Sequence, residues 1–505
     1  MPPNPSITKA DFLESLRSGF IPPIYREIHY NEPYLVYESL DIKKNSILLE
    51  SVKGPYKTAS YSFIGLDPYL IFKVKDGEVM IEAGSKKRGD KCTTLSFRSP
   101  LDRLSELITA YKQKCLPELP PFQGGAMGFF SYDFVRYIEN IPKNAVDDIL
   151  IPDAHFIMVD KIIAFDHLQK KAWFIISPGA RYTELGYRDI SNIDWDIVFD
   201  QSVEELMVKA EELDKELADI RFIKPKQKPL KLELNYEMPK EKYIDIVKRA
   251  KEYIAAGDIF QANLSQRISA YIGDKEPWEI YKVLRTINPS PFAAYLNFDE
   301  YYIVSSSPER LIKLNNGIIE TRPIAGTRPR GKDIIEDEQM RKELLLNIKE
   351  RAEHIMLIDL ERNDLGRVSE YGTVYVDELM TTEDYSHVIH IVSNIRGILQ
   401  KGKNCFDAIK ATFPGGTITG VPKVRCMEII DELEPVARGP YTGSLGYISF
   451  SGNMDFNIII RTFLIKNKIA YVQAGAGIVA DSDPEKEYFE TLKKAEALIK
   501  TLEKV

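Results

Sequence analysis

Cysteine and histidine are scarce in this chain of 505 residues, which has four of the former and six of the latter. The cysteines lie far apart and form no CxxC pair; they are Cys92, Cys115, Cys405 and Cys426. We therefore expect neither a disulfide framework nor a structural zinc site, and a reducing compartment fits. No GxSxG motif occurs either, and Cys426 falls on a regular amphipathic helix, so nothing indicates a nucleophilic triad.

The sequence also lacks long apolar runs and an excess of positive charge. No stretch of about 18 apolar residues suggests a membrane span. The first residues show no basic segment followed by an apolar run, so no signal peptide is expected. A net charge of -8 disfavours nucleic acid or an anionic membrane as the main partner. These features predict a cytoplasmic protein with no nucleic-acid and no membrane partner.

The first half of the chain is rich in β-branched and aromatic residues, which favour strands. Strands are predicted at residues 46–52, 59–66, 69–83 and 155–167, with a hairpin turn at Lys75–Glu78 and a glycine-rich strand at 124–134. Residues 202–220 have helical spacing. A polar, lysine-rich stretch follows, and we interpret residues 223–238 as a linker between a strand-rich region, 1–222, and a second region, 239–505.

The second region mixes helices and strands. Helices are predicted at 240–258, 337–364 and 421–435, and strands at 301–307, 444–450, 456–465 and 468–479. Helices combined with mostly hairpin-connected strands indicate an α+β fold, as opposed to a doubly wound parallel sheet.

Two predicted helices carry paired carboxylates. Glu350 and Glu353 share one helix face, and Glu487 and Glu490 share another, with Lys494 one turn beyond. Such pairs are often no more than solvated acidic faces. Both flanks are apolar here, however, so each helix must pack, and four carboxylates brought together would repel unless a cation joined them. Oxygen ligands without a histidine or cysteine cluster favour Mg²⁺.

Basic and glycine-rich segments form the second pattern. They are TRPIAGTRPRG (321–331), TFPGGTITGVPK (412–423), GPYTGSLGY (439–447) and AGAGI (474–478), with Arg461 in a predicted strand. Glycines allow backbone N–H groups to approach an anion, and arginine binds carboxylates through two hydrogen bonds. Each segment alone could be an ordinary turn. His387 and His390 fit either a buried structural role or a catalytic one.

Together these segments resemble the chorismate-utilising enzyme family. The resemblance rests on PIAGTRPRG, AEHIMLIDLERNDLGRV, YSHVIHIVSN, FPGGTITGVPKVRCMEIIDELEP, FNIIIRT and QAGAGIVADSDPEKEYFET, and it covers nearly the whole chain. It implies two large, mostly antiparallel β-sheets packed together with helices outside. It also implies that residues 239–505 form the chorismate-binding catalytic domain and that residues 1–222 correspond to the N-terminal region of anthranilate synthase component I.

The resemblance also implies roles for individual residues. Mg²⁺ would be held by Glu353 and Glu490, with Glu350 and Glu487 close by. The substrate carboxylates would be bound by Tyr441, Arg461, Gly477 and Lys494. Thr327 and Thr417 line the same pocket, with Gly326 and Gly475. Glu309 matches the general acid that protonates the departing 4-hydroxyl, and His390 matches the histidine beside the ring in the aminating members.

Two positions distinguish the branches of the family. Gln261 occupies the place of the lysine that activates water in isochorismate and salicylate synthases, and an amide cannot act as a base near pH 7, so amination is favoured. Ala325 is typical of anthranilate synthases, whereas well-studied aminodeoxychorismate synthases carry a lysine there. Phe292, Ala293, Gly416 and Glu361 depart from the anthranilate synthases and resemble aminodeoxychorismate synthases that also lack this lysine.

We therefore expect the large component of an aminodeoxychorismate synthase, which makes 4-amino-4-deoxychorismate for folate. The alternatives are anthranilate synthase component I and a chorismate-binding subunit without catalysis. Ammonia would come from a separate glutamine amidotransferase, because no cysteine lies in a nucleophile elbow. Leu49, Glu50, Ser51, Pro291 and Phe292 match the family's tryptophan pocket, with weak or absent feedback expected; residues 47–51 could also be only an edge strand.

Overall fold

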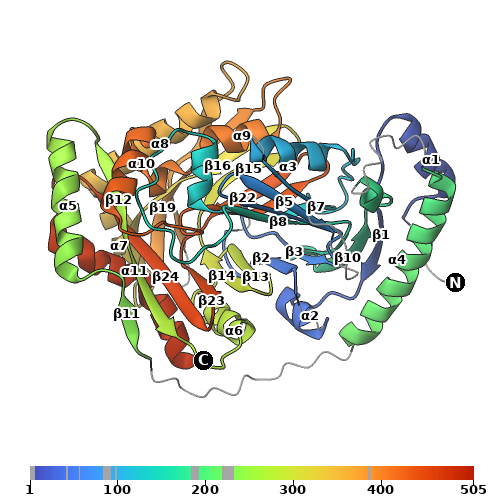
Figure 1. Cartoon of the computed structure of the whole chain (residues 1–505), viewed down its shortest axis with the longest axis horizontal. Coiled ribbons are helices and arrows are strands. Elements are labelled where there is room, and N and C mark those ends of the chain that lie inside the picture. Colours follow the sequence, from blue (N-terminus) through green and yellow to red (C-terminus); the bar gives the residue numbers. More distant parts are fainter. Residues whose placement is uncertain are drawn as a thin grey trace.

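The computed structural model describes residues 6–40, 44–55, 57–83, 93–96, 99–183, 193–218, 232–384 and 388–505. These residues form two antiparallel sheets of twelve strands each, surrounded by helices (Figure 1). The predicted α+β fold of two large antiparallel sheets is therefore confirmed.

The first sheet joins strands from both halves of the sequence. Its order is β1 (Ile24–Ile28), β10 (Lys171–Ile176), β9 (Lys161–Asp166), β3 (Tyr61–Leu66), β2 (Ser46–Glu50), β13 (Phe292–Asn297), β14 (Tyr301–Ser307), β23 (Thr462–Lys466), β24 (Ile469–Ile478), β12 (Gln261–Tyr271) and β11 (Leu234–Tyr236), and β20 (Gly420–Val421) also pairs with β12. The two halves of the chain meet where β2 pairs with β13.

The second sheet is built in the same way. Its order is β17 (Ile324–Pro329), β19 (Val388–Ile398), β16 (Ile318–Arg322), β15 (Arg310–Asn315), β22 (Met454–Ile458), β21 (Ser444–Ser449), β7 (Gly125–Phe130), β8 (Ala154–Val159), β4 (Leu70–Lys75), β5 (Glu78–Ala83) and β6 (Thr93–Ser96), and β18 (Tyr375–Asp384) pairs with β19. Here the halves meet where β21 pairs with β7.

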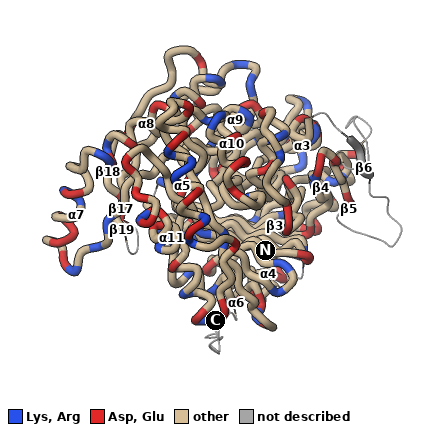
Figure 2. The backbone as a smooth tube through the Cα atoms, turned by 60° about the vertical axis from the view of Figure 1, so that its left-hand side comes forward, with Lys and Arg blue, Asp and Glu red and all other residues tan. Residues whose placement is uncertain are grey.

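The helices lie outside the sheets. They are α1 (Lys9–Arg17), α2 (Pro33–Ser39), α3 (Pro100–Thr109), α4 (Trp195–Ala218), α5 (Lys240–Ala255), α6 (Pro277–Ile287), α7 (Ile334–Leu346), α8 (Ile348–Gly366), α9 (Cys405–Thr412), α10 (Lys423–Leu433) and α11 (Pro484–Lys504). Figure 1 shows α5, α8, α10 and α11 gathered at one end and α1 and α4 at the other. No helix of the described residues is long and apolar enough to cross a membrane. In Figure 2 basic and acidic residues are interspersed along the chain.

The two sheets pack face to face through large apolar side chains. Phe63 of β3 contacts Tyr447 of β21, with ring centroids 5.3 Å apart. His155 of β8 is hydrogen-bonded to the hydroxyl of Tyr301 on β14, at 2.6 Å. These side chains are buried, and burial of aromatic surface of this kind is the main stabilising contribution to such a core.

The chain passes repeatedly from one sheet to the other through short connections. It does so between β8 and β9, between β14 and β15, and between β22 and β23. The predicted continuous strand at 456–465 is therefore wrong, because Arg461 has a φ of 52° and separates two strands that belong to different sheets. The stretch 155–167 is likewise two strands, one in each sheet.

The predicted helix at 337–364 is also interrupted. Asn347 has extended backbone angles, ends α7 and begins α8, and its side chain accepts a hydrogen bond from the N–H of Glu350. Asparagine favours this N-cap position because its side chain satisfies a free helical N–H group. The predicted hairpin between β4 and β5 is confirmed, with Asp76 and Gly77 at positive φ. Most of the predicted linker lies outside the described residues, but Leu234–Tyr236 within it form β11.

Candidate active site

Two neighbouring connections between the sheets bring Glu309 and Arg461 together. Glu309 lies between β14 and β15, and Arg461 lies between β22 and β23. The N–H of Ile458 donates to the carbonyl of Glu309 at 3.0 Å, and the N–H of Ser306 donates to the carbonyl of Arg461 at 3.2 Å. Because β14 pairs with β23 and β15 with β22, both connections run side by side, and the guanidinium charge reaches the carboxyl group.

Glu309 is a buried carboxyl group close to its titration point at neutral pH. Burial raises its pKa to about 7, although Thr417, the N–H of Ile324 and the positive charges of Lys494 and Arg461 oppose this rise. Its Oε1 has no hydrogen-bond partner. A carboxyl group with this pKa can hold a proton and release it at physiological pH, as a general acid must.

The four predicted metal-binding carboxylates lie on α8 and α11. Burial raises the pKa of Glu353 and of Glu487, and the negative charge of Glu490 adds to both shifts. Glu490 forms an ion pair of 2.8 Å with Lys494. The structure thus brings these three carboxylates, from α8 and α11, into one electrostatic cluster. The sequence alone did not show that the two helices lie together.

Glu350 is held differently. Its Oε1 accepts a hydrogen bond of 2.6 Å from Arg328, and its Oε2 is buried without a partner. No three histidine, cysteine, aspartate or glutamate side chains of the described residues are arranged to hold a metal ion. The donors nevertheless suit Mg²⁺, because they are oxygens, and a divalent cation would offset both the burial and the charge of Glu490 that raise the pKa of Glu353 and Glu487.

The glycines of β24 make room for the polar side chains around them. A Cβ at Gly477 would lie 2.6 Å from Nε2 of Gln261, and a Cβ at Gly475 would lie 2.8 Å from the hydroxyl of Tyr441. Lys494 donates to the carbonyl of Gly475 at 2.9 Å. Five of the predicted site residues therefore gather along one strand.

Gln261 connects this strand to the carboxylates. Its Nε2 donates to Oε1 of Glu353 at 3.2 Å, whereas its own Oε1 is buried without a partner. The amide at this position therefore serves as a hydrogen-bond donor to the acidic cluster and supplies no base.

His390 is neutral and fixed by β17. Its Nδ1 lies 3.0 Å from the carbonyl of Gly326 and 3.1 Å from the hydroxyl of Thr327. A carbonyl only accepts, so Nδ1 carries the hydrogen. Burial lowers the pKa of His390 to about 4, with the charge of Arg461 adding to this effect and the bond to Gly326 opposing it. The imidazole is therefore uncharged at pH 7, with Nε2 as its basic atom. His387 lies outside the described residues.

Ala325 and Gly326 shape the backbone beside His390. Gly326 has a φ of 61°, and a Cβ there would lie 2.1 Å from Oε2 of Glu350. Ala325 pairs with Ile391 in the ladder of β17 and β19. The segment TRPIAGTRPRG (321–331) thus contains β17, where the carbonyl of Gly326 and the hydroxyl of Thr327 contact His390 and Gly326 lies against Glu350.

Sequence reasoning missed Asn263. Its Oδ1 is buried without a partner and would lie 2.5 Å from a Cβ at Gly475. Its backbone is held on both sides, since its N–H donates to Thr419 and its carbonyl accepts from Arg438. The available signal was the alternation along β12, which places Gln261 and Asn263 on the same face of the strand.

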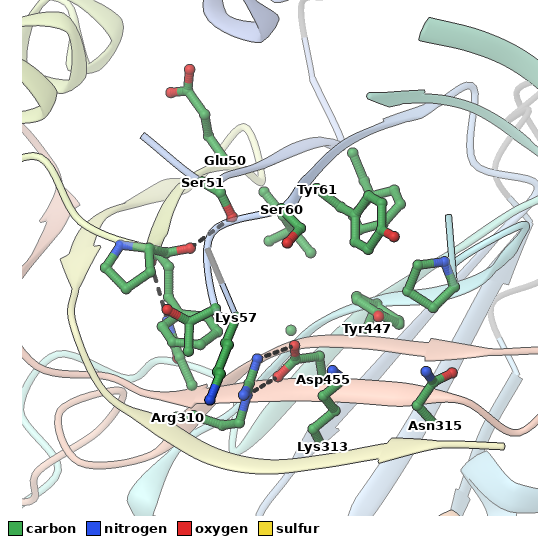
Figure 3. A pocket seen from close by; sticks show the side chains of 18 of the residues that line it. Glu50, Ser51, Lys57, Ser60, Tyr61, Arg310, Lys313, Asn315, Tyr447 and Asp455 are labelled. Atoms are coloured by element: carbon green, nitrogen blue, oxygen red, sulfur yellow. Dashed lines mark hydrogen bonds and ion pairs between the residues drawn. The ribbon is translucent and has the colours of Figure 1, made fainter. Parts of the chain in front are cut away.

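The five residues matched to a tryptophan pocket line one cavity of about 240 Å³. They are Leu49, Glu50, Ser51, Pro291 and Phe292. Arg310 also lines the cavity, where it binds both carboxylate oxygens of Asp455 at 2.9 and 3.0 Å and lies over the ring of Phe292 (Figure 3).

Glu50 does not offer its carboxylate to this cavity. Figure 3 shows its side chain directed away from the other labelled residues. The carboxylate is bonded to Arg285 at 2.8 Å and to the hydroxyl of Tyr281 at 2.5 Å. Arg310, the first residue of β15, directly follows Glu309, so the cavity and the buried acid lie at adjacent residues of the chain.

Comparisons with known proteins identify the family of this chain. Residues 44–500 match a family described as chorismate binding enzyme. The chain is 43% identical to anthranilate synthase component 1 of Acetivibrio thermocellus, over 95% of both chains. It is 44% identical to aminodeoxychorismate synthase component 1 of Bacillus subtilis (strain 168), over 91% of this chain and 92% of that protein.

A solved structure shows the same fold. The crystal structure of anthranilate synthase component I from Streptococcus pneumoniae TIGR4 superposes with a TM-score of 0.73 at 36% identity, and the match covers 87% of this chain and 92% of that one. The family match and these full-length similarities show that the chain belongs to the chorismate-binding enzymes and is a chorismate-utilising enzyme.

Proposed function

We propose that this enzyme aminates chorismate at C4 with ammonia, giving 4-amino-4-deoxychorismate, as the large component of an aminodeoxychorismate synthase. Gln261 is the observation that most supports amination over hydroxylation. Its amide donates to Glu353, and no lysine is present at this position to deprotonate water.

The proposed acid is Glu309. Its pKa of about 7 leaves it partly protonated at neutral pH, so it can donate a proton to the departing 4-hydroxyl, which leaves as water. His390, neutral and held by Gly326 and Thr327, is placed to contact the ring or to accept a proton from the attacking ammonia at Nε2.

The remaining polar residues would bind the carboxylates of chorismate. Arg461 and Lys494 supply positive charge near Glu309, and both lower its pKa, so they lie within electrostatic reach of the reaction centre. Tyr441 and Thr417 supply hydroxyl groups, and the hydroxyl of Thr417 is buried beside the carboxyl group of Glu309.

Glu353 and Glu490 would hold Mg²⁺, with Glu350 and Glu487 close by. When bound, the ion would neutralise the ring carboxylate of the substrate. Lys494 would then be released from its ion pair with Glu490 to contact the substrate.

Four residues support C4 over C2 as the position of amination. Phe292, Ala293, Gly416 and Glu361 differ from the residues typical of anthranilate synthases. Two of these differences lie at one packing contact, since a Cβ at Gly416 would lie 2.2 Å from the side chain of Leu360, the residue before Glu361. The absence of a side chain at Gly416 therefore lets α8 pack against this residue.

Anthranilate synthase component I is the alternative function. Ala325 favours it, and the two named relatives from different branches are equally similar, at 43% and 44% identity. Incubation with chorismate, Mg²⁺ and ammonium, with and without a lyase that releases 4-aminobenzoate, tests the proposal. We expect 4-aminobenzoate only when the lyase is present. Fluorescent anthranilate as the sole product would contradict 4-amination.

We further propose that ammonia is delivered by a separate glutamine amidotransferase. Release of ammonia from glutamine requires a reactive thiolate. Burial raises the pKa of Cys405 and of Cys426 to about 12, and it also raises the pKa of Cys115. These three cysteines are therefore inert thiols, and the relatives carry the designation component 1, which implies a second component.

For the 240 Å³ cavity we propose weak or absent inhibition by tryptophan. Phe292 packs against Arg310, and Arg310 is already bound by Asp455, so neither charged group is available for an amino-acid ligand. Strong inhibition of product formation by micromolar tryptophan would contradict this proposal.

A further inference from the structure

A second carboxyl group is buried near Glu309. Glu361, on α8, has an exposed fraction of 8%, and its Oε2 lies 2.6 Å from the hydroxyl of Thr321 on β16. The positive charge of Lys423 acts on Glu361, but Lys423 is bonded to Asp364 and to the carbonyl of Thr412. Among the described residues no ion pair involves Glu361.

The hydrogen count at Thr321 indicates the charge state of Glu361. The hydroxyl of Thr321 has one hydrogen, but it lies within bonding distance of two oxygens: the carbonyl of Leu311 at 2.9 Å and Oε2 of Glu361. A carbonyl can only accept. If Glu361 were ionised, one acceptor would lose its hydrogen. If Glu361 is protonated, it donates to Thr321, which donates to Leu311, and every group is satisfied.

Electrostatics act in the same direction. Burial raises the pKa of Glu361 well above its ordinary value, and the negative charges of Glu309 and Asp364 raise it further, while Thr321 and Lys423 oppose this. Burial and the negative charge of Glu309 thus both favour the protonated form of Glu361.

The residues next to the two carboxyl groups pack close together. Leu311 lies two residues after Glu309 on β15. Leu360, next to Glu361, packs against Gly416, which precedes the Thr417 that neighbours Glu309. The two acids therefore share one buried region in which both cannot ionise without strong repulsion.

We propose that Glu361 carries a proton at neutral pH and that its charge state is coupled to that of Glu309, so that the two carboxyl groups titrate as one acid pair. When Glu309 gives its proton to the departing hydroxyl, the carbon–oxygen bond breaks and water leaves, and the pair still holds one proton. A proton from solvent restores the second. This role for Glu361, as a positioning residue, rests on the proposed function of Glu309; the protonation of Glu361 does not.

Glu361→Gln tests the protonation through stability. In the unfolded chain Glu361 ionises in the ordinary range, whereas in the folded protein it keeps its proton, so wild-type stability falls as pH rises from 5 to 8. The neutral glutamine removes this loss and can still donate to Thr321. The apparent melting temperature of the variant, measured at a fixed scan rate, should equal that of wild type near pH 5 and exceed it increasingly up to pH 8.

Glu50→Gln is the matched control, because Glu50 is equally buried but is paired with Arg285. This variant should melt below wild type at pH 8. If Glu361→Gln also melted below wild type at pH 8, or differed equally at every pH, Glu361 would not be protonated. Neither result depends on which reaction the enzyme catalyses.

Infrared titration and kinetics test the coupling between Glu361 and Glu309. The carbonyl band of protonated Glu361, identified by its loss in Glu361→Gln, should disappear at lower pH in Glu309→Gln, because the charge of Glu309 is gone. An unchanged midpoint would overturn the coupling.

In kinetics, kcat/KM of Glu361→Gln should fall about tenfold per pH unit above pH 8, and that of wild type less steeply. Superimposable profiles would overturn the coupling of Glu361 to the catalytic proton transfer.

Discussion

Glu309 and His390 are both buried, and burial shifts their pKa values toward each other's usual range. The carboxyl group rises to about 7 and the imidazole falls to about 4. Because each shift favours the uncharged form, Glu309 is partly protonated and His390 is neutral near pH 7. Each can therefore take part in proton transfer at physiological pH.

Glu309→Gln should lower kcat by about 10²–10⁴-fold, since the amide cannot donate a proton to the departing hydroxyl. In wild type, activity should decline as pH rises above about 7, the pKa of Glu309. The variant should melt no lower than wild type at pH 7.5, because a carboxyl group with a raised pKa destabilises the folded state there. Turnover above about a tenth of wild type would require a different acid.

Glu490→Gln should leave the protein folded but remove most Mg²⁺-dependent activity, because the substitution removes one negatively charged carboxylate from the cluster. Chelation with EDTA should abolish wild-type activity, and Mg²⁺ should restore it. Glu496→Gln on the same helix is the control; its partners are the surface residues Lys493 and Lys500, and its activity should be unchanged. Full activity in EDTA would contradict a metal-dependent reaction.

At the scale of helices and strands, the sequence predicted what depends on local pattern. α5 and α10 lie within the predicted ranges 240–258 and 421–435, because their apolar spacing is regular. The break at Asn347 and the left-handed Arg461 were missed. Periodicity reports whether a segment is a strand, but not which sheet it joins, and both errors fall where the chain changes direction to bring site residues together.

The site segments themselves were identified by their resemblance to a family, and the structure supplies what that resemblance lacked. It joins Gln261 to Glu353 and His390 to Gly326 by hydrogen bonds. It also shows that Asn263 has a buried side-chain oxygen at the site and that Glu361 is hydrogen-bonded to Thr321. None of these contacts could be read from the sequence, because each joins residues far apart in the chain.

Gly326→Ala tests the strand that contacts His390. The change strains a φ of 61° and places a Cβ 2.1 Å from Oε2 of Glu350, so Glu350 or β17 must move. Gly317→Ala is the control, since Gly317 also has a positive φ but no neighbour within 4 Å. Both should lose about 1–3 kcal/mol of unfolding free energy. Only Gly326→Ala should also lose activity, by more than about tenfold; equal activity would contradict the role of this strand.

At the scale of the whole molecule, each sheet joins a block of strands from the first half of the chain to a block from the second half, so the candidate site and the 240 Å³ cavity share one scaffold. The acid and the cavity arginine, Glu309 and Arg310, are consecutive residues. The described residues include three buried or partly buried cysteines and no reactive thiol among them. The described cysteines therefore support the proposal that ammonia comes from a separate protein.

The purified chain should therefore form product with ammonium salts and form none with glutamine as the nitrogen donor. The assay requires protein shown by mass spectrometry to be free of a copurified amidotransferase. Substantial product from glutamine under these conditions would mean that this chain releases ammonia itself.

The position of the new carbon–nitrogen bond tests the central claim most directly. Chorismate and ¹⁵N-ammonium are incubated with the enzyme and Mg²⁺, and the product is examined by NMR without any lyase. We predict that the label is bonded to C4 of a non-aromatic ring that retains its enolpyruvyl group. Label on C2 of an aromatic ring, with one equivalent of pyruvate released, would contradict 4-amination and identify the enzyme as an anthranilate synthase.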